Sequence, residues 1–313
     1  MSDDTGDGTP PTPPDRHTAF HRLHHGERPL LLPNAWDHAS AAALARRGFP
    51  AIGTTSLGVA AAAGLPDATG ATRDRTLALA RGIARLPALV SVDIEGGFSD
   101  RPEEVAALAA ELDQAGVVGV NIEDGRPDGT LAPLARQCAV IAAVKERVPR
   151  LFVNARTDTH WLAAIGGAGA VPPSRTAAFE RAEAYVRAGA DGVFVPALTD
   201  ERDIGALVRD LGGTPLNILF APGRHTYERL AELGVRRISC GSLLFRAALD
   251  RAVELAWTIA HPTGRTDLGT DPGTDLGRAA GLPTYAEAQS LAEDFADDVT
   301  AHITEDVTGG TRT

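Results

Sequence analysis

Cysteine, basic residues and long apolar runs are all scarce in this sequence of 313 residues, and each shortage excludes something. The two cysteines, Cys138 and Cys240, lie far apart and suit a reducing compartment better than a disulfide framework. Lysine and arginine number 30 against 41 acidic residues, and a net charge of -11 argues against a nucleic-acid partner. No apolar run approaches the roughly 20 residues that span a bilayer, and the acidic, proline-rich N-terminus has no signal-peptide layout. We therefore expect a cytoplasmic protein with no nucleic-acid or membrane partner.

The apolar share of 43% is ample for a large core, and the composition divides the chain into four parts. Residues 1–16 are rich in Asp, Gly, Thr and Pro and are predicted to form a disordered tail. Residues 17–260 are predicted to form a catalytic barrel, and residues 261–283 a flexible linker. Helical periodicity returns after Thr284, so residues 284–313 are expected to hold a C-terminal helix and tail.

Within residues 17–260, short apolar runs alternate with helical segments, and many of the helices stop at a glycine such as Gly116 or Gly189. Strands that alternate with helices pair in parallel through right-handed crossovers. Eight such units predict an α/β fold, a (β/α)8 TIM barrel with a C-terminal helical extension, and an open doubly wound sheet is the alternative. The expected strands lie near residues 30–33, 50–53, 88–92, 117–122, 150–154, 192–195, 215–220 and 235–239.

Charged side chains follow three successive strands of this pattern. Val90–Gly97 and Gly119–Gly125 each run from an apolar strand into carboxylates and then glycine, and Leu151–Asp158 ends on Arg156 and Asp158. In a barrel the C-terminal strand ends meet at one face, where active sites lie. Carboxylate oxygens suit a hard divalent cation and an arginine suits an anionic substrate, so this face is predicted to be an active site.

Several motifs in the same order resemble the isocitrate lyase/phosphoenolpyruvate mutase superfamily, and specifically its mutase-like branch. The resemblance runs from about Phe20 to Ala260 and is carried by Leu32–Asp37, Gly53–Gly58, Gly64–Asp67, Asp93–Gly97, Asn121–Asp124, Asn154–Asp158, Gly189–Pro196 and Gly234–Ser239. It implies a Mg2+-dependent enzyme (Mn2+ is the alternative ion) that acts on a small anionic carboxylate or phosphonate. It also implies a homo-oligomer, a dimer or tetramer that exchanges a C-terminal helix.

The resemblance assigns a role to each group at the strand ends. Asp93 matches the direct metal ligand, while Glu95, Glu123 and Asp67 match carboxylates that hold the waters of the metal. Arg156 matches an arginine that contacts a substrate carboxylate or phosphonate, although a salt bridge to Asp158 is the structural alternative. The segment Thr55, Ser56 and Leu57 matches a loop that clasps the substrate carboxylate or enolate, and an ordinary strand-to-loop connection is the alternative.

Other residues are candidates with a plain structural alternative beside them. Trp36, Asp37, Asn217 and Pro196 end strands and could line the substrate pocket, although a tryptophan in such a place can equally plug the barrel. For Asp124, which comes directly after Glu123, a solvated or helix-capping role is the preferred interpretation. His17, His21, His24, His25, His160 and His225 show no ligand spacing and are expected at the surface.

The chain departs from the family in the segment that gates the site. The C–C lyases carry Lys-Lys-Cys-Gly-His after the strand-ending glutamate, and the C–P mutases carry a lysine and an asparagine. Residues 124–133 contain none of these and offer Arg126, Asp128 and Thr130 instead. The expected activity is therefore a Mg2+-dependent lyase that cleaves a C–C bond of a small 2-oxo or 2-hydroxy acid through an enolate-like intermediate. The alternatives are a phosphonomutase or phosphonopyruvate hydrolase, and a barrel without catalysis.

Overall fold

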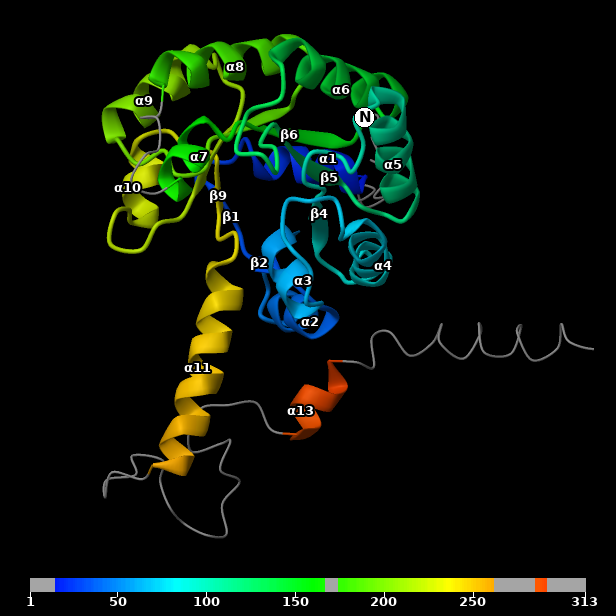
Figure 1. Ribbon diagram of the computed structural model, residues 1–313, viewed down its shortest axis with the longest axis vertical. Coiled ribbons are helices and arrows are strands. Elements are labelled where there is room, and N and C mark those ends of the chain that lie inside the picture. The colour runs from blue at the N-terminus through cyan, green and yellow to red at the C-terminus, as the bar shows by residue number, and fades with distance from the viewer. Residues whose placement is uncertain (1–14, 167–173, 262–284, 292–313) are drawn as a thin grey trace, which may run out of the picture.

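The computed structural model describes residues 15–166, 174–261 and 285–291 (Figure 1). Most of the predicted N-terminal tail and linker, and most of the predicted C-terminal segment, lie outside these residues. The first described helix, α1 (Arg16–Leu23), begins where the tail was expected to end, because the Asp15 side chain accepts a hydrogen bond from the Thr18 N–H and caps it.

Nine parallel strands form a single sheet that closes on itself. β1 (Leu30–Leu32) pairs with β9, whereas β2 (Asn34–Ala35) pairs with β3, so these two short strands are halves of one strand interrupted at Pro33. Counting the halves together gives the eight strands of a (β/α)8 barrel, and the predicted fold is confirmed. The other strands are β3 (Ala51–Thr54), β4 (Leu89–Asp93), β5 (Gly119–Glu123), β6 (Phe152–Arg156), β7 (Gly192–Phe194), β8 (Leu216–Leu219) and β9 (Arg237–Ser239).

Helices surround the sheet and bury its outer surface in an apolar layer (Figure 1). They are α2 (His38–Arg46), α3 (Ser56–Ala62), α4 (Arg73–Ile83), α5 (Pro102–Gln114), α6 (Leu134–Arg147), α7 (Thr159–Ile165), α8 (Arg175–Arg187), α9 (Glu201–Asp210) and α10 (Tyr227–Glu232). Pro102 occupies the first turn of α5, where the N–H that proline lacks would have no partner inside the helix.

The two ends of the barrel are built differently. At the N-terminal end of the strands, Phe20 of α1 packs edge-on against Phe152, with ring centroids 5.5 Å apart, and joins a small apolar cluster with Leu30, Leu32 and Val118. The interior nearer the other end is polar, because Ser91, Asn121, Asn154, Asn217 and Arg237 fill positions where barrels usually carry branched apolar residues. Polar interior side chains therefore lie beneath the C-terminal strand ends.

α11 (Leu243–Ala260) leaves the barrel and projects away from it (Figure 1). It carries large apolar side chains in solvent, including Val253, Trp257 and Ile259, of which Trp257 is 62% exposed. The short helix α13 (Tyr285–Ser290) lies against α2, where Arg46 Nη1 donates a hydrogen bond to Ser290 Oγ at 2.6 Å. In the described part of the chain, no helix has the length and apolar character needed to cross a membrane.

Candidate active site

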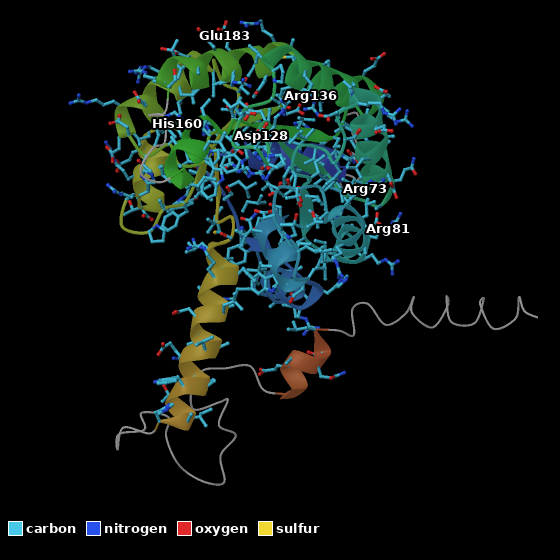
Figure 2. The ribbon with its side chains drawn as sticks, in the orientation of Figure 1. Arg73, Arg81, Asp128, Arg136, His160 and Glu183 are labelled. Atoms are coloured by element: carbon cyan, nitrogen blue, oxygen red, sulfur yellow. The ribbon has the colours of Figure 1, made fainter. Side chains whose placement is uncertain are left out.

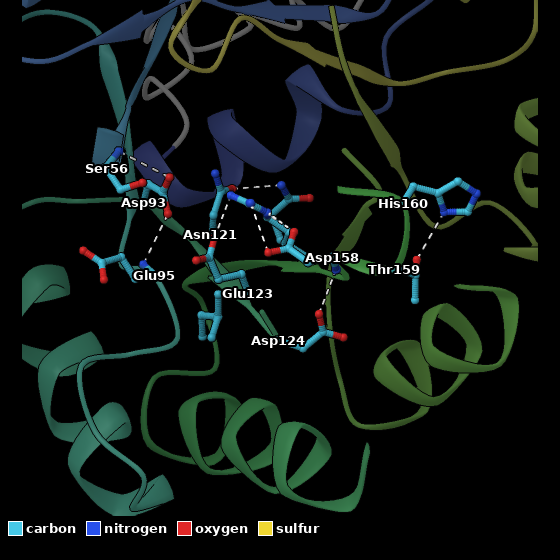
Figure 3. Close-up of polar contacts among 12 residues, drawn as sticks. Ser56, Asp93, Glu95, Asn121, Glu123, Asp124, Asp158, Thr159 and His160 are labelled. Atoms are coloured by element: carbon cyan, nitrogen blue, oxygen red, sulfur yellow. Dashed lines mark hydrogen bonds and ion pairs between the residues drawn. The ribbon is translucent and has the colours of Figure 1, made fainter. Parts of the chain in front are cut away.

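A cavity of about 320 Å³ opens at the C-terminal ends of the strands. Four carboxylates and two arginines line it: Asp67, Asp93, Glu123, Asp158, Arg126 and Arg156. Asp93, Glu123 and Arg156 are the last residues of β4, β5 and β6, so parallel register alone brings them to one rim. Figure 3 shows Asp93 and Glu123 there. Of the predicted strand-end groups, the structure brings Asp93, Glu123, Arg156 and Asp158 together around one cavity.

Asp93 is buried and held by hydrogen bonds on several sides. Its Oδ2 accepts from the Ser56 N–H at 3.5 Å and its Oδ1 from the Glu95 N–H at 3.3 Å, while its own N–H donates to Thr54 Oγ1 at 2.9 Å. Glu95 adopts φ +50°, a left-handed conformation that costs a non-glycine residue free energy. This turn places the Glu95 N–H next to the Asp93 carboxylate, to which it donates.

The Glu95 carboxylate points to the α4 side of the turn. It accepts hydrogen bonds from the Gly70 N–H at 2.9 Å and from Thr72 Oγ1 at 2.5 Å. Glu95 does not line the main cavity but lines a neighbouring one of about 250 Å³. Of the three predicted metal-site carboxylates, Glu95 is thus the one set back from the main cavity.

Arg156 is anchored by two acids. Its Nη1 forms an ion pair with Glu123 Oε2 at 2.6 Å, and its Nε and Nη2 donate to the two oxygens of Asp158 at 2.6 and 3.1 Å. The salt bridge to Asp158 that the sequence left as an alternative is therefore present. Gly125 makes this arrangement possible, because a Cβ at that position would lie 2.3 Å from Asp158 Oδ2.

Asp124 lies behind the cavity and is fully buried. Its Oδ1 accepts from the Asp158 N–H at 2.7 Å, and its Oδ2 accepts from Arg181 Nη1 at 2.9 Å and Tyr185 OH at 2.5 Å. The preferred interpretation was right to keep Asp124 out of the site. It was wrong in detail, because Asp124 is neither solvated nor a helix cap: it ties α8 to the backbone of Asp158.

The pKa values of Asp93, Glu123 and Arg156 are all raised in the folded protein. Burial raises the pKa of Asp93, and Asp67 adds to the rise while Arg156 opposes it. The pKa of Glu123 lies well above its usual value, again through burial first, with Arg156 opposing and Asp158, Asp93 and Asp67 adding to the rise. Burial alone would lower the pKa of Arg156, but Asp158, Glu123 and Asp93 outweigh it and raise the pKa. The rim thus carries an excess of negative charge that a cation would relieve.

The donor set fits a hard cation that keeps part of its water shell. The buried Asp67 Oδ1 accepts no hydrogen bond from the described residues, and Glu123 Oε2 has only its ion pair with Arg156; both side chains line the cavity. No three His, Cys, Asp or Glu side chains of the described ranges cluster closely enough to coordinate one ion together. Mg2+ usually takes one or two carboxylates directly and holds others through waters, so these side chains could hold such an ion.

The segment Thr55–Leu57 forms the start of α3 and lines the same cavity. First-turn N–H groups of a helix have no partner inside the helix, and the Ser56 N–H already points at Asp93. The Ser56 N–H and the Asp93 carboxylate therefore lie side by side in the wall of this cavity.

The structure brings only one of the four additional pocket candidates to the cavity. Pro196 lines it. Asp37 is exposed and caps α2, accepting from the Ser40 N–H at 2.7 Å, and Trp36 packs edge-on against Phe245 of α11. Asn217 is buried in the interior, where its Oδ1 accepts from Ser239 Oγ at 3.2 Å. We therefore withdraw Trp36, Asp37 and Asn217 as substrate-binding residues, because capping, helix packing and interior hydrogen bonding already occupy them.

One interior residue was missed by reasoning from the sequence. Arg237 of β9 is 1% exposed, its Nη2 donates to Asn121 Oδ1 at 3.0 Å, and burial lowers its pKa to about 9 although Asp93 acts to raise it. An arginine inside a short apolar strand, next to a polar interior, was the signal that could have revealed it.

Comparison with known proteins agrees with this geometry. Residues 20–260 match the phosphoenolpyruvate phosphomutase family, and the chain belongs to that family. An uncharacterised protein of Mycobacterium tuberculosis is 45% identical over 242 residues, which cover 77% of this chain and 89% of the relative. The 2-methylisocitrate lyase of Salmonella typhimurium is 31% identical over 255 residues, covering 76% of this chain and 82% of that enzyme.

Solved structures show the same fold. The crystal structure of a putative phosphonomutase from Burkholderia cenocepacia superposes with a TM-score of 0.71 at 34% identity, covering 78% of this chain and 98% of that one. Phosphonopyruvate hydrolase, in its complex with oxalate and Mg2+, superposes with a TM-score of 0.74 at 22% identity, covering 90% of this chain and 96% of that one. The second likeness supports the fold alone.

Proposed function

We propose that this protein is a Mg2+-dependent lyase that cleaves a C–C bond of a small 2-oxo or 2-hydroxy acid through an enolate-like intermediate. The observation that carries the proposal is the cluster of buried carboxylates, with pKa values raised by burial, facing the first turn of α3 across one cavity. The 2-methylisocitrate lyases among the relatives, such as the one from Salmonella typhimurium, support lyase chemistry.

Each group of the rim has a part in this proposal. Asp93 would hold the metal directly, and Asp67, Glu95 and Glu123 would hold its waters; Mn2+ could serve in place of Mg2+. When bound, the metal would supply Lewis-acid catalysis. The N–H groups of Ser56 and Leu57 and the Thr55 hydroxyl would hold the developing negative charge of the enolate, since the Thr55 N–H already donates to the Ala35 carbonyl at 3.1 Å. Arg156, kept charged by its acidic neighbours, would stabilise that charge electrostatically.

A phosphonomutase or phosphonopyruvate hydrolase is the second candidate, favoured by the 34% identity to a putative phosphonomutase. Against it, the gating segment carries no lysine, and Lys145, the single lysine of the sequence, lies elsewhere. Its Nζ donates to the Leu151 carbonyl at 2.9 Å and to Asp191 at 2.8 Å, before the start of β6 and far from the strand ends. A barrel without catalysis is the third candidate.

Two measurements separate these candidates. Thermal unfolding with Mg2+, with oxalate and with both together tests for a site: joint stabilisation is expected, and its absence would favour the barrel without catalysis. Turnover of oxaloacetate, 2-methylmalate-type acids and phosphonopyruvate with Mg2+ then tests the reaction. Carbon–carbon cleavage without phosphonate turnover is the expected result, and the reverse pattern would establish the second candidate.

We further propose that the protein is a cytoplasmic homo-oligomer, a dimer or tetramer. The support is α11, which exposes Val253, Trp257 and Ile259 to solvent within a single chain. Light scattering of the wild type and of Trp257→Ser tests this: the variant should have the lower mass, and a monomeric wild type would contradict the proposal.

A further inference from the structure

The charged groups of the main cavity are unevenly engaged. Glu123 and Asp158 occupy three nitrogens of Arg156. Arg126 lines the same cavity, and its guanidinium makes no hydrogen bond or ion pair within the described part of the chain. An anionic group that enters the cavity therefore meets one arginine held by acids and one that is available.

A tight hairpin presents Arg126 to the cavity. Gly125 bridges to Leu131, the Arg126 N–H donates to the Thr130 carbonyl at 2.9 Å, and the Gly129 N–H donates to the Arg126 carbonyl at 3.0 Å. Pro127 suits the second position of this turn. Of the three polar candidates in the segment, Asp128 and Thr130 bind each other, with Thr130 Oγ1 donating to Asp128 Oδ1 at 2.6 Å. Asp128, labelled in Figure 2, is exposed, and of the three residues only Arg126 is among those that line the cavity.

Arg126 also lines the neighbouring cavity of about 250 Å³, so it lies where the two cavities meet. Arg136 of α6, labelled in Figure 2, lines this outer cavity as well, and its Nη2 donates to the Ser99 carbonyl at 2.8 Å and pairs with Asp100 at 3.0 Å. Arg136 Nε is buried and has no partner in the described residues. Of the two arginines that line this outer cavity, Arg136 is therefore held by Asp100 and Ser99, whereas the Arg126 guanidinium has no such partner among the described residues.

We infer that Arg126 binds the second anionic group of the substrate and so selects diacids over monoacids. This inference rests on the proposed function, which places the first carboxylate and its neighbouring oxygen at the rim. A carboxylate one or two carbons further along the substrate then reaches the junction of the two cavities. The planar guanidinium can bind it in a bidentate manner, while Arg156 stays with Glu123 and Asp158.

The test uses a matched pair of ligands with Mg2+ present. Malate and 2-hydroxybutyrate share the 2-hydroxy acid end and the carbon chain, and differ in a distal carboxylate against a methyl group. Oxalate, which has no distal group, reports on the rim alone. Dissociation constants are measured by calorimetry for the wild type, Arg126→Gln, Arg126→Lys and Arg147→Gln, the last an exposed arginine at the far end of α6.

The wild type should bind malate about ten- to a hundredfold more tightly than 2-hydroxybutyrate. Arg126→Gln should remove most of that preference and leave oxalate unchanged, Arg126→Lys should restore part of it, and Arg147→Gln should match the wild type. Equal binding of the two ligands by the wild type, or an unchanged preference in Arg126→Gln, would overturn the role of Arg126 while leaving the proposed function intact. Failure of the wild type to bind oxalate with Mg2+ would instead overturn the proposed function, and this inference with it.

Discussion

Asp124 allows the support of the site to be tested apart from ligand binding. It does not line the cavity, yet its carboxylate holds the backbone of Asp158 in place. Asp124→Asn keeps the size of the side chain and an oxygen for the Asp158 N–H, but removes the negative charge opposite Arg181 Nη1. The Arg181 side chain is only 14% exposed, so its charge would remain largely buried without a counter-ion. Its remaining partners are Tyr185 OH at 3.1 Å and the Ala132 carbonyl at 3.0 Å.

Breaking a buried ion pair by removing one partner costs about 3 kcal/mol or more. For a domain of this size, each kcal/mol lowers the unfolding midpoint by about 2–4 °C, so Asp124→Asn should lower it by about 6–12 °C. Tyr185→Phe is the matched control, because it removes one neutral donor from the same carboxylate, and should cost about 1 kcal/mol.

Thermal unfolding followed by circular dichroism measures these shifts, and calorimetry of Mg2+ with oxalate measures the site in the same samples. The double variant Asp124→Asn/Arg181→Met should lose less stability than the two single variants lose in sum, since it leaves no buried charge unpaired. A midpoint for Asp124→Asn within about 2 °C of the wild type would refute this reasoning. So would a loss of oxalate binding without a loss of stability, because that would make Asp124 a site residue.

Two further predictions concern the rim itself. Burial and Asp67 raise the pKa of Asp93 against the effect of Arg156, so the metal-free folded protein holds more protons than the unfolded chain, and its stability falls as the pH rises through that pKa. In EDTA, the unfolding midpoint of Asp93→Asn should therefore rise relative to that of the wild type as the pH rises above the ordinary carboxyl range. The variant should also lose stabilisation by Mg2+ with oxalate, and parallel pH curves would contradict this. Gly125→Ala places a Cβ 2.3 Å from Asp158 Oδ2 and should weaken binding of Mg2+ with oxalate about tenfold, whereas Gly96→Ala, with its nearest atom at 3.7 Å, should bind as the wild type does. Equal affinities for the two alanine variants would show that the position of Asp158 is unimportant.

Much of the barrel was predictable because each βα unit carries its own local signals. Apolar runs and glycine stops located the strands, and since parallel strand ends share one face, the positions of Asp93, Glu123 and Arg156 followed. Two helices lacked such signals. α3 reads Ser-Leu-Gly-Val-Ala-Ala-Ala, with no polar face to give periodicity, and α7 has only seven residues.

Contacts between distant residues were not predictable from spacing. Asp124 meets Arg181 and Tyr185 about 60 positions later, and no local pattern marks that meeting. The expectation of surface histidines was wrong for His17, His24, His160 and His225, which are buried, whereas His25 is exposed. His24 was expected at the surface, but it is 1% exposed, its ring stacks on Phe152 at 4.1 Å, and burial lowers its pKa well below the usual value.

The interrupted first strand has a consequence for how this chain reaches its native state. Asn34 links the chain just after β9 to the end of β3, where the barrel closes. Its Oδ1 accepts hydrogen bonds from the Cys240 and Gly241 N–H groups at 2.9 Å, and its Nδ2 donates to the Thr54 carbonyl at 2.7 Å. More than 200 positions separate Asn34 from Cys240, so during synthesis the nascent chain passes through a stage with two unpaired sheet margins. A growing polypeptide in that state is open to pairing with a second copy, and protection arrives only once β9 has left the ribosome.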